Sequence, residues 1–133
     1  MKLFIFSALV CCALASFDFR SYSNITVIGT VICGEKRIPG VLVELREAGV
    51  FVDETLNTTR TDLQGNFKIF GEKWEIGSIE PYLRISHACR RNKPNCELRS
   101  PYPIPDDKIN GVYNMTFVNL DVAQRKEEDV NCK

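Results

Sequence analysis

The stretch Ile25-Thr-Val-Ile-Gly-Thr-Val-Ile-Cys33 decides the fold class, because β-branched residues occupy both of its faces. A strand that is apolar on both faces is typical of the inside of a β-sandwich. In Val41-Leu-Val-Glu-Leu-Arg46, which follows, Val41, Val43 and Leu45 alternate with Leu42, Glu44 and Arg46, as in a half-buried strand. Turn-forming residues at 34–40 separate the two runs. A short strand followed by a turn is therefore the repeating unit of the chain.

Residues 55–70 carry the clearest turn signal. A Thr-rich run at 55–61 and an alternating run at 66–70 flank Asp62-Leu-Gln-Gly65. We predict a hairpin here, in which the Asp62 side chain caps the turn and Gly65 adopts a positive φ. A calcium site is not favoured, because one carboxylate falls far short of the six to eight oxygen ligands that the ion prefers.

Three later segments complete the strand pattern. Tyr82–Ala88 alternates so that Leu83, Ile85 and His87 share a face, residues 96–104 contain prolines that favour a sheet edge, and 113–122 is strongly β-forming. The charged tail 124–133 is expected to be held only through Cys132. No segment has a sustained helical period, so we predict one all-β sandwich domain of about seven or eight strands.

The N-terminus is typical of a secretory signal peptide. Met1-Lys2 precedes the apolar run 3–14, which is shorter than the roughly 20 residues needed to span a bilayer. Small residues in Ala13-Leu14-Ala15 predict cleavage before Ser16. The expected signal peptide is 1–15 and the mature domain is 16–133, which we expect to be secreted, extracellular and not membrane-spanning. Cleavage also removes Cys11 and Cys12.

Export would place the four remaining cysteines in an oxidising environment, where two disulfides are expected. Sequence alone allows three pairings. We favour a local Cys89–Cys96 bridge with Cys33–Cys132 holding the tail, because Cys89 and Cys96 are close in sequence. A zinc site is not favoured, since the spacings lack the C-x₂₋₄-C pattern, and no other metal or cofactor is expected.

Export also gives meaning to three Asn-x-Thr sequons, at Asn24, Asn57 and Asn114. An attached glycan needs solvent, so each occupied asparagine must face outward. We treat the three as candidate glycosylation sites and as markers of the surface.

Composition and scattered polar residues limit the functional classes. The charges balance, with 17 Lys+Arg against 17 Asp+Glu, which disfavours nucleic-acid binding. The single histidine, His87, lies on an inward strand face and is expected to be structural. A Cys89–Cys96 bridge would display Arg90, Arg91 and Lys93 on a constrained loop, which makes these cations a candidate partner-binding site.

Four blocks carry a resemblance to a known family, namely Val27–Cys33, Pro39–Leu45, Thr61–Phe67 and Ile79-Glu-Pro-Tyr-Leu-Arg-Ile-Ser-His-Ala-Cys89. Together they resemble the secreted transthyretin-like family that is expanded in nematodes. Cys96, the Ile104-Pro105 step and Cys132 follow in the same order. The resemblance implies a transthyretin-like (prealbumin-like) sandwich.

The resemblance also bears on activity. Hydroxyisourate hydrolases of this fold use histidine, arginine and a C-terminal Tyr-Arg-Gly-Ser, whereas this chain has one histidine and ends Val-Asn-Cys-Lys. We therefore expect no enzyme but an extracellular binding or signalling module, whose partner is a protein, a glycan or a lipid headgroup. The alternative is a carrier of a small apolar ligand, such as a lipid or a hormone-like molecule.

Overall fold

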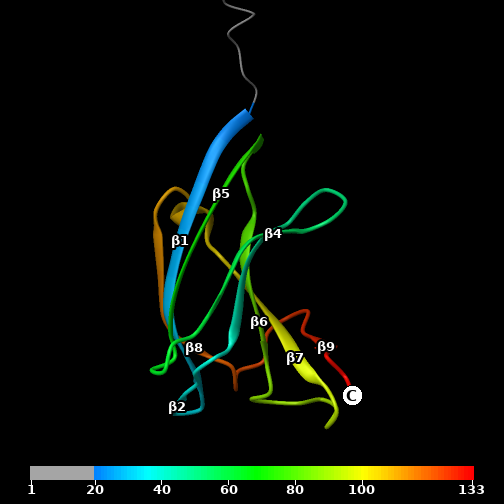
Figure 1. The fold of residues 1–133 in the computed structure, drawn as a ribbon. Coiled ribbons are helices and arrows are strands. Elements are labelled where there is room, and N and C mark those ends of the chain that lie inside the picture. The colour runs from blue at the N-terminus through cyan, green and yellow to red at the C-terminus, as the bar shows by residue number, and fades with distance from the viewer. Residues whose placement is uncertain (1–19) are drawn as a thin grey trace, which may run out of the picture.

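The computed structural model describes residues 20–133, which form two packed β-sheets (Figure 1). The elements are β1 (Arg20–Cys33), β2 (Lys36–Arg37), β3 (Leu42–Glu47), β4 (Glu54–Arg60), β5 (Asn66–Ile76), β6 (Pro81–His87), β7 (Glu97–Pro103), a 3-10 turn η1 (Asp106–Lys108), β8 (Val112–Asn119) and β9 (Glu128–Val130). The predicted all-β class is confirmed. The strands exceed the expected number because β2 and β9 are too short to show a period in the sequence.

Residues 1–19 lie outside the described part, and with them the expected signal peptide, Cys11 and Cys12. Between residues 20 and 133, no helix is long and apolar enough to cross a bilayer.

The first sheet has four strands and the second has five. In the first sheet, β1 lies between the antiparallel β5 and the parallel β8, and β2 extends its end. The second sheet has the order β4-β3-β6-β7-β9, and all of its pairs are antiparallel. The prolines of β7 pair only with β6, while its first residues also pair with β9, so the prolines lie where β7 forms an edge.

The core fills the space between the sheets. Its fully buried members come from the inward faces of β1, β3, β5, β6 and β7, and they include Ile25, Val27, Val43, Leu45, Ile69, Leu83, Ile85 and Leu98. Burying each such side chain stabilises the fold by roughly 1.5–3 kcal/mol. The alternation predicted for β3 and β6 is confirmed, because Val43, Leu45, Leu83 and Ile85 all point inward.

The hairpin predicted at residues 55–70 is wrong, although its turn is correct. Asp62 Oδ1 accepts hydrogen bonds from the backbone N–H groups of Gln64 (2.9 Å) and Asn66 (2.8 Å), and Gly65 has φ +80°. The flanking strands nevertheless belong to different sheets, since β4 pairs with β3 and β5 pairs with β1. The turn therefore carries the chain across the sandwich, and a turn signal alone does not say which strand pairs with which.

The favoured disulfide pairing is also wrong. The bridges are Cys33–Cys89, with a Cα–Cα distance of 5.7 Å, and Cys96–Cys132, with 4.1 Å. Strand ends decide this pairing. Cys33 ends β1 and Cys89 follows β6, so this bridge joins the two sheets, whereas Cys96 precedes β7 and Cys132 follows its partner β9.

The tail is held by more than Cys132. Strand β9 pairs with β7 through three residue pairs. In addition, the backbone N–H of Lys133 donates to the carbonyl of Asn95 at 3.0 Å. The expectation of a tail attached at one point is therefore wrong, because Glu128, Asp129 and Val130 form a short edge strand that the sequence pattern does not reveal.

Candidate functional site

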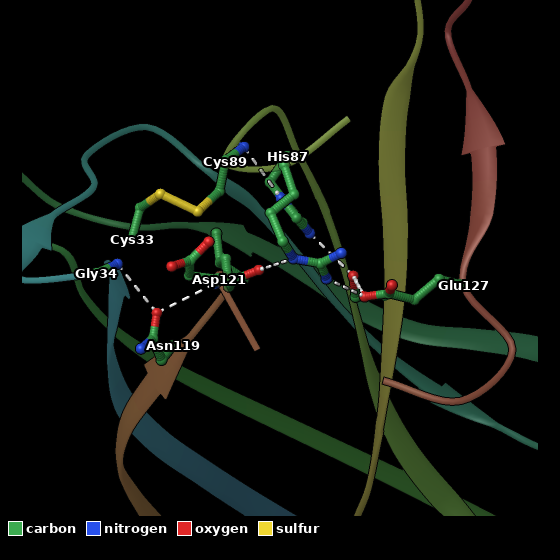
Figure 2. The surroundings of a disulfide bond; sticks show 10 residues. Cys33, Gly34, His87, Cys89, Asn119, Asp121 and Glu127 are labelled. Carbon is green, nitrogen blue, oxygen red and sulfur yellow. Dashed lines mark hydrogen bonds and ion pairs between the residues drawn. A yellow bond between two sulfur atoms is a disulfide. The ribbon is translucent and has the colours of Figure 1, made fainter. Parts of the chain in front are cut away.

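A buried polar network lies beside the Cys33–Cys89 disulfide (Figure 2). His87 is 3% exposed and Ser100 is fully buried. The backbone N–H of Cys89 donates to His87 Nδ1 at 3.2 Å, and His87 Nε2 lies 2.9 Å from Ser100 Oγ. Strand pairing brings these side chains together, since His87 ends β6 and Ser100 lies on the adjacent β7.

The hydrogen bond from the Cys89 N–H to His87 Nδ1 sets the direction of the other hydrogen bonds in the network. Because Nδ1 accepts, a neutral His87 carries its proton on Nε2 and donates to Ser100 Oγ. The Ser100 hydroxyl then donates to Glu127 Oε2 at 2.6 Å, and Arg90 Nη2 donates to the same oxygen at 2.7 Å. Every polar group of this chain of hydrogen bonds is thus matched with a partner.

The network also shifts proton affinities. Burial, followed by the nearby Arg90 guanidinium, lowers the pKa of His87. Burial opposes ionisation of Glu127, but the hydrogen bonds from Ser100 and Arg90 outweigh it and lower the pKa of that carboxyl. A neutral histidine and an ionised glutamate are therefore the favoured states at neutral pH.

The order of the groups does not suit nucleophilic catalysis. In a serine nucleophile triad the histidine lies between the serine and the carboxylate. Here the serine lies between His87 and Glu127, its proton is directed to the carboxylate, and its side chain has no solvent access. His87 is thus hydrogen-bonded inside the fold, as expected from its strand position. Among residues 20–133, no group of three or more His, Cys, Asp or Glu side chains could hold a metal ion.

The basic loop differs from its expected form. It is not closed by its own disulfide, because Cys89 and Cys96 bond to other cysteines. Arg90 is turned into the fold, where its Nε donates to the carbonyl of Leu120 at 3.1 Å and its Nη2 reaches Glu127. Arg91 and Lys93 are exposed, and Arg91 Nη1 donates to the carbonyl of Pro94. Two of the three predicted cations therefore remain on the surface.

The three sequons differ in their surroundings. Asn24 is half-buried in the middle strand β1, whereas Asn57 on β4 and Asn114 on β8 are exposed. Asn57 Nδ2 donates to the carbonyl of Phe70 at 2.8 Å. Exposure therefore favours Asn57 and Asn114 over Asn24 as positions that can accept a bulky group.

The opposite end of the sandwich carries a feature that the sequence analysis missed. In the β3–β4 loop, Val50, Phe51 and Val52 are 93%, 99% and 76% exposed. The loop projects away from the two sheets (Figure 1). A signal was present in Gly49-Val-Phe-Val-Asp53, where three consecutive apolar residues stand between turn-forming residues.

The base of this loop is fixed by hydrogen bonds. Asp53 Oδ1 accepts from the backbone N–H of Gly49 at 3.3 Å, and Asp53 Oδ2 accepts from the Tyr82 hydroxyl. Arg46 Nε donates to the same hydroxyl at 3.0 Å. Below the loop, Lys73 bridges Glu47, Glu54 and Glu75 at 3.0, 2.7 and 3.4 Å, which links β3, β4 and β5. The apolar tip thus stands on a rigid, charged base.

A groove of about 1520 Å³ runs from the loop across the outer face of the second sheet. Ala48 and Asp53 line the loop end of the groove. Arg84 and Arg99 line its floor, where Arg84 makes two 3.0 Å hydrogen bonds to Glu44 and Arg99 Nη1 lies 3.3 Å from Glu128. Both of these arginines are therefore paired with a carboxylate of the protein.

Comparison with known proteins agrees with the fold. The profile of the Transthyretin-like family matches residues 28–105, from within β1 to just beyond β7. Transthyretin-like protein 16 of Caenorhabditis elegans is 39% identical over 127 residues, covering 92% of this chain and 96% of the relative. Transthyretin-like protein 5 of the same organism is 33% identical over 112 residues, covering 83% and 79%. This chain belongs to the transthyretin-like family.

Proposed function

We propose that this protein is an exported, non-catalytic binding module that recognises an extracellular protein through the β3–β4 loop and the neighbouring groove. The observation that carries the proposal is the exposure of Val50, Phe51 and Val52. A contiguous exposed apolar patch at the tip of a loop on a rigid scaffold is typical of an interaction site.

The chemistry of the loop favours a protein partner. Phe51 is 99% exposed, so burying it in a pocket of the partner contributes roughly 1.5–3 kcal/mol and makes it a natural anchor. Charged side chains lie around the base of the loop, including those of Asp53, Glu54 and Glu80. Glu80 is held next to the loop, because its carbonyl accepts a hydrogen bond from the Ala48 N–H. An apolar centre with a charged rim is the arrangement found in protein interfaces.

The same charges disfavour an anionic membrane. Five carboxylates at the base of the loop, those of Glu47, Asp53, Glu54, Glu75 and Glu80, face the two cations Lys73 and Arg46. The net negative charge would be repelled by anionic headgroups as the loop approached the lipid surface. Arg91 and Lys93, the exposed cations of the basic loop, lie at the other end of the sandwich and cannot compensate at the tip. Lipid binding is therefore an outcome for the test rather than the proposal.

Export and the lack of catalysis have separate support. Two disulfides in a small domain are characteristic of oxidising compartments, and the N-terminal residues match a cleavable signal peptide. The Ser100 hydroxyl is buried and bonded to Glu127, which leaves no free nucleophile in this network. The large groove beside the loop has a charged floor, which disfavours a small apolar ligand there.

The test uses the oxidised mature chain as bait in extracellular fluid of the source organism. A variant with Val50→Ser, Phe51→Ser and Val52→Ser removes the apolar tip. The matched control is Leu63→Ser, because Leu63 is 83% exposed but lies on the 62–65 turn. A partner identified by mass spectrometry is then purified and its affinity for the three proteins is measured.

The expected result is a loss of more than tenfold in affinity for the loop variant and no change for the control. Equal binding by all three proteins would refute the role of the loop. Native mass spectrometry of the protein from its natural source separates the alternative, because a carrier would retain a small apolar adduct. Binding to phosphatidylcholine vesicles that is lost in the loop variant would instead identify a lipid surface as the target.

A further inference from the structure

Apolar side chains are exposed on the outer face of the first sheet, among polar side chains such as Lys68 and Glu72 of β5. Phe70 on β5 is 44% exposed, and Val112 and Phe117 on β8 are 57% and 59% exposed. Strand register places these side chains around the middle of β1, since Thr26 pairs with both Phe70 and Val112, and Thr30 pairs with Phe117. The second apolar face of β1, which suggested burial on both sides, is therefore only half-buried.

Asn114 stands within this apolar face. It is exposed, and it pairs with Ile28, whose side chain lies on the same outer face of β1. Along β8 it lies between Val112 and Phe117, while Tyr113 and Met115 pack inward against the core. A substituent on Asn114 would therefore extend over Val112, Ile28 and Phe117.

The local geometry leaves the reactive atom of Asn114 free. Its Oδ1 accepts from the backbone N–H of Thr116 at 2.9 Å, and none of the residues 20–133 accepts a hydrogen bond from its Nδ2. Asn57 differs, since its Nδ2 donates to Phe70 O. Asn24 is half-buried, and its backbone N–H and carbonyl both form hydrogen bonds with Asn110. Of the three sequons, Asn114 accommodates a glycan with the least rearrangement.

We infer that Asn114 carries an N-linked glycan whose first sugars cover the apolar outer face of the first sheet. In the attachment, Asn114 Nδ2 forms a bond to the anomeric carbon of an oligosaccharide, and the bond from that carbon to a lipid diphosphate carrier breaks. The diphosphate leaves with the electron pair, and the amide loses one proton. The modification rests on the proposed export, because it requires entry into the secretory pathway.

The glycan has two physical consequences. Sugar rings present apolar C–H surface that removes part of the Phe117 and Val112 side chains from water, and their hydroxyl groups keep the outside polar. The glycan also protects the free edge of β8, which pairs only with β1 in the described part of the chain. The bulge between Asn114 and Phe117, where Thr116 has φ +60°, disrupts the same edge. Both features oppose association through this sheet.

The test expresses the protein in a eukaryotic secretory host in two forms. One form keeps residues 1–15, and its failure to leave the cell would contradict the proposed export alone. The other form carries a standard cleavable signal peptide, so that the glycan is tested whatever the native leader does. Peptide mass spectrometry measures occupancy at each sequon. Asn114→Gln removes the proposed site, and Asn57→Gln is the matched control on an exposed strand of the other sheet.

We expect Asn114 to be occupied in most secreted molecules. In Asn114→Gln, the fluorescence of a bound anilinonaphthalene dye should more than double and sedimentation should detect association, whereas Asn57→Gln should match the wild type. Adding Phe117→Ser to Asn114→Gln should return both signals toward the wild type. The inference fails if secreted protein is unmodified at Asn114. It also fails if enzymatic removal of the glycan from folded protein leaves dye binding and sedimentation unchanged.

Discussion

The two ends of the sandwich are built in opposite ways. At one end, two disulfides enclose His87, Ser100, Glu127 and Arg90, and each of these polar groups is bonded to another. At the other end, the tip of the β3–β4 loop has three apolar side chains in contact with little but solvent. The first end has the residue types of a catalytic site, but its polar groups form their hydrogen bonds with one another inside the fold. The second end has no reactive group, but its exposed apolar side chains can be buried by a partner.

Residue type is therefore a poor guide to function unless the partners of each side chain are known. A histidine, a serine and a glutamate attract attention in the sequence, and here they stabilise a strand end. Val50, Phe51 and Val52 form only a short apolar run in the sequence, and their exposure in the fold shows that they are available to a partner. Changes at the disulfide end should therefore affect stability, and changes at the loop should affect binding.

The largest effect is expected from removing the bridge between the sheets. Replacing Cys33 and Cys89 together with alanine opens a loop of 56 residues and should cost about 2–5 kcal/mol of unfolding free energy. Urea unfolding followed by intrinsic fluorescence measures the loss. A loss below about 1 kcal/mol would show that the disulfide end does not dominate stability.

Glu127→Gln should cost about 1–3 kcal/mol, because Arg90 and Ser100 lose a charged acceptor. Glu128→Gln is the matched control on the neighbouring residue. Glu128 is 58% exposed and pairs with Arg99 at the surface, so its loss should cost less than about 1 kcal/mol. Chemical denaturation measures the free energy of unfolding of both variants. Equal losses would mean that the buried network stabilises the fold no more than a surface ion pair does.

Lowering the pH should reduce the free energy of unfolding through the buried groups of the disulfide end, His87 before Glu127. Burial and Arg90 lower the pKa of His87 in the folded state, while Glu127 and Glu97 act in the opposite direction. Its contribution to stability is therefore complete above its unfolded pKa of about 6.5 and is lost as pH falls through the lower folded value. The pKa of Glu127 is also lowered, so its contribution is lost at still lower pH.

The measurement is the free energy of unfolding between pH 8 and pH 4. Protonation of His87 Nδ1 would oppose the Cys89 N–H, which donates to that atom. In His87→Gln the decrease between pH 7 and pH 5 should become shallower. The same slope in the variant and the wild type would show that other groups control the acid response.

At the loop end, the triple serine variant of Val50, Phe51 and Val52 should change stability by less than about 0.5 kcal/mol, because these side chains are exposed. Thermal and urea unfolding test this expectation, and the loss of partner binding described above should accompany it. A decrease of more than 1 kcal/mol would mean that the loop packs on the protein in solution, which would undermine its role as a free contact surface.

The smallest effect is expected for the exposed cations of the basic loop. Arg91→Glu with Lys93→Glu should leave both stability and affinity for a loop-binding partner nearly unchanged, since these residues lie at the disulfide end. Arg90→Gln, in contrast, should lower stability, because it removes the ion pair with Glu127. A strong loss of affinity in the double variant would move the binding surface to the disulfide end.

The amino-acid sequence alone predicts the longer strands and most of their inward faces, because alternation with period two is a local property that few residues suffice to show. It also determined the turn at Asp62 and Gly65, where side-chain and backbone conformation depend on immediate neighbours. The blocks around Cys33 and Cys89 were enough to identify the family.

The contacts between distant groups depend on the strand order and on the packing of the two sheets. Strand order separated β4 from β5, and the pairing of β7 with β9 brought Cys96 to Cys132 and not to the nearby Cys89. It also joined Arg90 to Glu127, which lies 37 residues away, and so withdrew a predicted surface cation from the surface. No local pattern in the chain encodes such contacts, because they follow from strand register and from the packing of whole sheets.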